Sequence, residues 1–69
     1  MKNYRINIMT YDYKFTSHFE FTASDDIAAN ARASEIARET AGCIAYNLEI
    51  RVPNHRAKLG YSYKVVFFS

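Results

Sequence analysis

The sequence sets one segment of small side chains between segments that carry the large ones. Residues 24–41 contain six alanines, whereas the aromatic side chains lie on either side of this segment. A helix of small residues can lie close to a sheet whose aromatic side chains stand up to meet it. This contrast predicts one α+β core in which an alanine-rich helix packs on an aromatic sheet. The side chains expected to face the helix include Tyr4, Phe15, Phe19, Phe21, Tyr46, Tyr61, Tyr63 and Phe67.

Four segments alternate between apolar and polar side chains and are therefore predicted to be half-buried strands. They are residues 2–11, 13–22, 44–52 and 61–68. A turn at Asp12 and Tyr13 would place apolar residues of the first two strands opposite each other, with Ile6 facing Phe19. In the last strand, Val65 and Phe67 are expected to point inward. Ser62, Lys64, Val66 and Phe68 are expected to point outward.

The predicted helix has signals at both ends. Ser24 is the expected N-cap, and Asp25 and Asp26 follow it at the positive end of the helix dipole. Gly42 supplies the left-handed residue that ends many helices. Between these ends, one stripe at spacings of three and four is expected to face the sheet. It consists of Ala29, Ala33, Ile36, Ala37 and Thr40.

The order of elements is β-β-α-β-β in a single domain of residues 1–69. A right-handed crossover through the helix places the third strand beside the first, so the expected fold is a four-stranded antiparallel sheet of order 2-1-3-4 with the helix on one face. The other face is expected to be open and polar, and Arg5 and Glu49 can pair across it. Its other expected members are Asn7, Thr16, His18, Glu20 and Asn47.

The sequence offers little material for catalysis. Cys43 is the only cysteine, and it follows a helix C-terminus, where a thiolate is not favoured, so it is interpreted as a small core residue. His18 and His55 have no partner at a catalytic or metal-binding spacing. We therefore expect no enzyme activity, no metal and no cofactor. The chain shows neither a signal peptide nor a membrane span, which predicts a cytoplasmic protein, in a host cell if it is phage-encoded.

Charge is distributed unevenly although the net charge is only +2. After Glu49 the chain has basic side chains and no acidic one, an asymmetry that can indicate an anionic partner. The candidate residues for binding a partner or nucleic acid are Arg5, Lys14, Arg51, His55, Arg56, Lys58 and Lys64. The candidate interface residues are Tyr11, Tyr13, Val66 and Phe68, of which the last two lie on the edge strand where a partner or a second copy can dock.

The layout of the chain resembles that of small phage-encoded accessory proteins, including anti-CRISPR inhibitors of multi-subunit surveillance complexes. The likeness is carried by Tyr4-Arg5-Ile6, by Phe21-Thr22-Ala23-Ser24 before the alanine-rich segment, and by Leu48-Glu49-Ile50 followed by Tyr63-Lys64. It spans nearly all residues and implies a protein that binds a nuclease complex and blocks its access to DNA. Inhibitors of this kind that mimic DNA are strongly acidic, whereas this chain is mildly basic, so the resemblance favours direct protein contact or shared binding of nucleic acid.

Two functions follow as expectations. The first is a non-enzymatic protein-binding module that inhibits a host defence complex, with a host protein or ribonucleoprotein as partner. The second is a small nucleic-acid-binding protein that uses the basic segment 51–64. An open face without aromatic side chains would argue against stacking of bases, which is how many single-stranded nucleic acids are bound.

Overall fold

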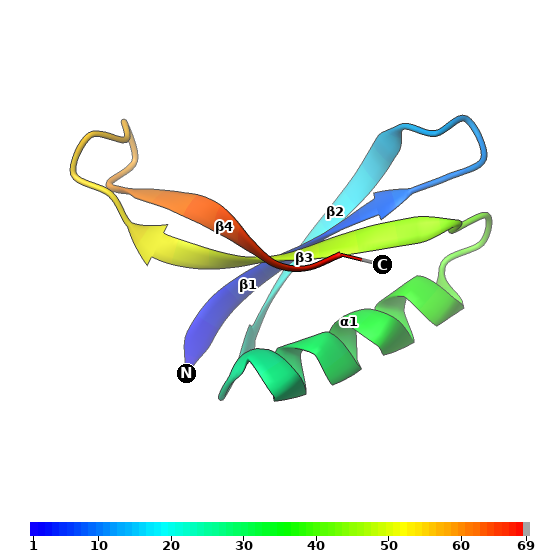
Figure 1. The fold of residues 1–69 in the computed structure, drawn as a ribbon, viewed down its shortest axis with the longest axis horizontal. Helices are drawn as coiled ribbons and strands as arrows, with labels where there is room; N and C mark the ends of the chain where they lie inside the picture. Colours follow the sequence, from blue (N-terminus) through cyan, green and yellow to red (C-terminus); the bar gives the residue numbers. More distant parts are fainter. Residues whose placement is uncertain (69) are drawn as a thin grey trace.

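The structure is a computed structural model that describes residues 1–68, apart from the Thr16 side chain, so the placement of that side chain on the open face lies outside the described residues. Its elements are β1 (Lys2–Met9), β2 (Phe15–Ala23), α1 (Asp26–Glu39), β3 (Ala45–Pro53) and β4 (Tyr61–Phe68). The strands form one antiparallel sheet of order β2-β1-β3-β4, with α1 on one face (Figure 1). The predicted fold class, strand order and orientations are confirmed.

As far as Ile8, the first hairpin has the register that a turn at Asp12 and Tyr13 would give, but its loop is wider. Ile6 lies opposite Phe19, and Tyr4 lies opposite Phe21. The loop spans residues 10–14 because the amide of Tyr13 donates to the carbonyl of Thr10 at 2.9 Å, with Tyr13 in the left-handed region at φ 61°. A bulge between the Ile8 and Met9 pairings absorbs the extra length and places Phe15 opposite Met9. Both strands are therefore shorter at this end than predicted.

The N-cap of the helix lies one residue later than predicted. Asp25, not Ser24, is the N-cap: its backbone is extended, and its Oδ1 accepts from the amide of Ala28 at 2.8 Å. The carboxylate therefore satisfies one free amide of the first turn. At the other end, Gly42 has the predicted positive φ of 79°. A Cβ on Gly42 would lie 3.2 Å from Cε2 of Tyr11, so both the backbone and the space favour glycine here.

The core lies between α1 and the two central strands. Ala29 and Ala33 are completely buried, as the predicted stripe requires, and Cys43 packs against the core from the turn after the helix. The other buried residues are Tyr4, Ile6, Ile8, Ala23, Tyr46 and Leu48. A helix about 10 Å wide is narrower than four strands spaced about 4.8 Å apart. Phe19 and Phe67, on the outer strands, consequently stay about half exposed instead of filling the core as expected.

A bulge in the second hairpin overturns the predicted faces of β4. Leu48 lies opposite Phe67, but the next pairing joins Glu49 to Val65, so Val66 is an extra residue. Arg51 then lies opposite Tyr63, and Pro53 opposite Tyr61. Directly opposed residues share a face, so Tyr61, Tyr63 and Val65 lie on the open face and not against the helix. Val66, expected to point outward, packs against the core.

No helix in residues 1–68 combines the length and the apolar character needed to cross a membrane.

Candidate interaction surface

Charged and amide side chains form a continuous row across the open face of the two central strands. The guanidinium of Arg5 lies 2.9 Å from the Glu49 carboxylate through both Nε and Nη2, which confirms the predicted pair. The amide of Asn7 donates to Asn47 at 2.7 Å and also to Glu49. These contacts join positions that the sheet register sets directly opposite or next to each other. They connect β1 to β3 on the face that the helix does not cover.

Tyrosines of β4 extend this row to both edges of the sheet. The Arg5 guanidinium carbon lies 3.8 Å from the centre of the Tyr63 ring, and that of Arg51 lies 4.2 Å from the Tyr61 ring. The Tyr63 hydroxyl donates to Glu20 of β2 and accepts from Arg51 at 3.3 Å. Arg51 also lies 3.7 Å from the Glu20 carboxylate. We call these five residues the open-face network: Arg5, Glu20, Arg51, Tyr61 and Tyr63.

The network shifts the pKa values of its own members. The hydrogen bond from Tyr63, with the positive charge of Arg51, lowers the pKa of Glu20 against a smaller opposing effect of desolvation. Desolvation, followed by the hydrogen bond to Glu20, raises the pKa of Tyr63. The predicted binding residues Arg5 and Arg51 are therefore engaged within the molecule. One atom is left over: Nε of Arg51 is buried without a hydrogen-bond partner among the described residues.

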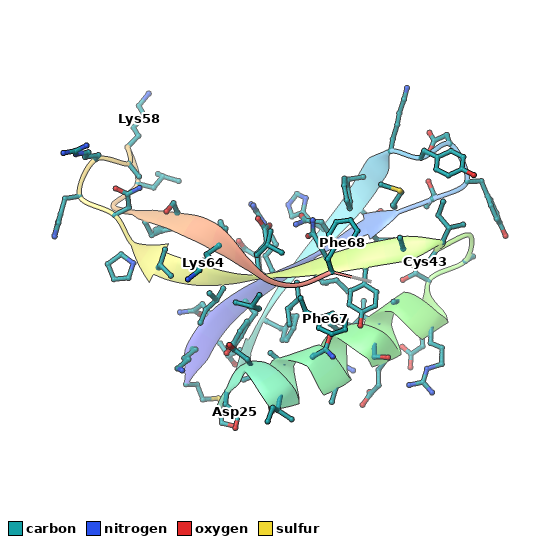
Figure 2. All side chains as sticks on the ribbon, in the orientation of Figure 1. Asp25, Cys43, Lys58, Lys64, Phe67 and Phe68 are labelled. Atoms are coloured by element: carbon teal, nitrogen blue, oxygen red, sulfur yellow. The ribbon has the colours of Figure 1, made fainter. Side chains whose placement is uncertain are left out.

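The loop between β3 and β4 presents the remaining cations. Its backbone is fixed by the Asn54 amide, which donates to the Gly60 carbonyl at 3.0 Å, and by the Asn54 side chain, which accepts from the amide of Arg56 at 3.0 Å. Figure 2 shows Lys58 on this loop and Lys64 on the same hairpin. The predicted candidates on this hairpin are His55, Arg56, Lys58 and Lys64, all of them exposed. Lys64, expected to point outward, lies opposite Ile50 and therefore on the helix side of the sheet. Lys14 belongs to the loop of the other hairpin, which lies apart from this one in Figure 1.

The outer edge of β4 is flanked by apolar side chains on both faces of the sheet. Val65, which is 49% exposed, and Phe68, which is 65% exposed, lie on the open face, where Phe68 is opposite Asn47. On the helix side, β4 and α1 border a groove of about 310 Å³. It is lined by Asp26, Ile27, Asn30, Val66 and Phe67. Figure 2 shows Phe67 and Phe68 together at this end of β4.

The opposite edge of the sheet has a different character. A groove of about 420 Å³ lies between β2 and α1, where Phe19, Phe21 and Ile36 are accompanied by Arg32 and Glu39. Charges of both signs therefore border it. The predicted interface residues Tyr11 and Tyr13 are exposed on the loop after β1, and Tyr11 lies against Gly42. The predicted interface set is thus divided between the first loop and the β4 edge.

Comparison of the chain with protein-family models, with curated proteins and with solved structures found no match. Within residues 1–68, no three histidine, cysteine or acidic side chains gather in a way that could hold a metal ion.

The sequence did not predict that Tyr63 would contact Glu20 and Tyr61 in the open-face network. The bulge at Val66 is the cause, because one extra residue moves every earlier side chain of β4 to the other face. One signal was present in the sequence. Val66 and Phe68 interrupt the polar side of the alternation in residues 61–68, as a strand with a bulge near its end would.

Proposed function

We propose that this chain is a non-enzymatic protein-binding module, and that it inhibits a host defence complex of the CRISPR type on behalf of a phage or mobile element. The observation that supports the binding module is the edge of β4, which pairs with β3 alone. Both sides of this edge carry exposed apolar side chains, Val65 and Phe68 on one and Phe67 on the other. Apolar surface beside an unpaired strand edge is typical of sites where proteins associate.

The open-face network supports protein contact over base stacking. Each of its two tyrosine rings has a guanidinium over one face, and the two rings meet edge to face with their centres 5.9 Å apart. A base could reach the guanidinium-covered face of either ring only by displacing these contacts. Both arginines also lie within 4 Å of a carboxylate of this chain, so their charge is largely offset before a phosphate arrives.

The inhibitor function can be tested in bacteria that carry an active CRISPR-type system and are challenged with a phage that the system targets. Expression of the chain should restore plating of the phage. Val65→Arg should abolish this rescue because it places a long cation on the apolar edge of β4. Phe15→Arg is the matched control, since Phe15 is 48% exposed on the other edge strand, and it should leave the rescue intact. Absence of rescue across hosts that carry different CRISPR-type systems would contradict the proposed inhibitor.

A nucleic-acid-binding function is the second candidate, and one observation favours it. The bulge places Tyr61 and Tyr63 on the open face, where aromatic side chains were not expected, and the basic loop immediately precedes Tyr61 in the chain. Fluorescence anisotropy with labelled single-stranded DNA and RNA, at low and at physiological salt, tests it. This function predicts salt-dependent binding that is lost when Arg56 and Lys58 are both changed to glutamate. Binding that survives these two changes would contradict it.

A further inference from the structure

We propose that the outer edge of β4 binds an extended segment of a partner protein as an added strand. The segment is acidic where it passes Lys64 and the 54–60 loop, and apolar where it passes Phe67 and Phe68. This inference rests on the proposed binding function and specifies the chemistry that the surface recognises.

The backbone of β4 is suited to strand addition. β4 spans eight residues and is hydrogen-bonded to β3 only, so the peptide groups on its outer side lack a strand partner. Proteins commonly protect such an edge with proline, lysine, a bulge, inward-pointing charges or a covering loop. β4 has two of these devices, Lys64 and the bulge at Val66, but it contains no proline, and no other strand covers its outer side. An extended peptide can therefore continue the sheet and gain main-chain hydrogen bonds, as in other cases of strand addition.

The C-terminal half of β4 determines the apolar part of the segment. Alternate side chains of an added strand point to opposite faces of the sheet. One set would enter the groove beside Val66, Phe67 and Ile27, whose other lining residues, Asp26 and Asn30, bond to the hydroxyls of Tyr4 and Tyr46. The other set would cover Val65 and Phe68 on the open face. The groove volume of about 310 Å³ lies at the small end of ligand sites, about 300–1,000 Å³, which suits single side chains better than a separate ligand.

The N-terminal half of β4 and its loop determine the acidic part. Arg56, Lys58 and Lys64 are exposed, and none of their side chains forms an ion pair within residues 1–68. No acidic residue follows Glu49 in the sequence, so the hairpin itself does not neutralise these cations. A carboxylate on the added strand would meet complementary charge there, which favours association and fixes the orientation of the segment.

The same charges argue against a second copy of this chain as the occupant. A symmetric pair of antiparallel β4 strands places the same edge against itself. If the pairing were centred on Val65, each Lys64 would lie opposite Val66 of the other copy. The two lysines would then be diagonal neighbours about 7–8 Å apart, and β4 itself has no acidic side chain to separate them. Asp26, which lines the groove beside Val66, already accepts a hydrogen bond from Tyr4. An acidic partner removes this repulsion.

The proposal can be tested by selecting displayed random peptides, about twelve residues long to span the strand and loop, on the immobilised protein. Selected peptides should combine alternating apolar residues in one half with aspartate or glutamate in the other. Reversing two charges, with Lys58→Glu and Lys64→Glu, should weaken their binding about tenfold or more. Lys14→Glu, on the other hairpin, is the matched control and should leave binding unchanged. Hydrogen exchange should show added protection of β4 amides and not of β2 amides.

Several results would overturn the proposal. They are selected peptides without acidic residues, unchanged affinity in the doubly reversed variant, added protection at β2, and a dimer in sedimentation whose β4 amides are already protected. The last result would identify a second copy as the occupant. Peptide selection needs no defence complex, and phage rescue needs no peptide. A failed peptide selection with intact phage rescue would therefore contradict only the strand-addition site. A failed phage rescue with successful peptide selection would contradict only the proposed inhibitor function.

Discussion

The two faces of this sheet are stabilised by different interactions. The face under α1 is apolar, and its two tyrosine hydroxyls bond to the helix: Tyr4 donates to Asp26 at 2.7 Å and Tyr46 to Asn30 at 3.1 Å. The open face carries the network of arginines, acids and tyrosines. A single helix covers one face of a small sheet, so the other face must be stabilised by cross-strand contacts between polar side chains. Those contacts occupy Arg5 and Arg51, which is why we propose the edge of β4 as the surface for binding.

Removing one side chain from each face is expected to show the largest difference between them. Leu48 is completely buried in the covered face, and Leu48→Ala should lower the free energy of unfolding by about 2–5 kcal/mol. Its neighbour Asn47 accepts a hydrogen bond on the open face, and Asn47→Ala should cost about 1 kcal/mol. Urea denaturation followed by circular dichroism measures both. Equal losses would show that the two faces contribute equally.

Alkaline pH should weaken the covered face more than the open one. Burial, followed by the hydrogen bond to Asp26, raises the pKa of Tyr4 from 10.0 to about 12. A raised pKa means that the folded state holds its proton more tightly than the unfolded state. The resulting stabilisation is complete below pH 10 and is lost as the pH rises through about 12, an effect of roughly 2–3 kcal/mol.

Two variants show which face of the sheet causes the loss of folding stability at alkaline pH. Tyr4→Phe removes the hydroxyl of the covered face whose pKa is raised to about 12, and it should abolish most of the loss of stability above pH 10. Tyr63→Phe removes the corresponding group of the open face, whose pKa is also raised, and should abolish less of it. Denaturation at a series of pH values measures the slope for each variant. A larger effect of Tyr63→Phe would reverse the assignment.

The sequence was sufficient for the two central strands and the helix that packs on them, and insufficient for β4. Alternation in residues 2–11 and 44–52, together with the alanine stripe, predicted the central strands and the helix contact, because burial leaves a strong periodic signal. The predicted faces of Phe67 and Phe68 were right and those of residues 61–66 were wrong, because a bulge depends on how two strands pair and not on the composition of one. The contact between Arg5 and Tyr63 depends in turn on that bulge, so it could not be predicted before the register was known.

The smallest expected effect is the change in folding stability of the open face at acid pH. The direction of this change follows from the lowered pKa of Glu20. The hydrogen bond from Tyr63 lowers the pKa of this carboxyl below its ordinary value of 4.5. Glu20 therefore stabilises the fold above pH 4.5, and this contribution is lost as the pH falls through the lower pKa of the folded state. Because Glu20 lies at the surface, salt and solvent screen the effect and keep it small.

Glu20→Gln should flatten the stability profile below pH 4.5, and Tyr63→Phe should flatten it in the same way because it removes the hydrogen bond that lowers the pKa. The carboxyl resonance of Glu20, followed by nuclear magnetic resonance through a pH titration, gives an independent measurement. In the Tyr63→Phe variant its midpoint should move upward, toward 4.5. An unchanged midpoint would mean that Tyr63 does not hold this carboxylate in solution. The remaining contact between β4's neighbour β3 and the edge strand β2 on the open face would then be the ion pair of Arg51 with Glu20.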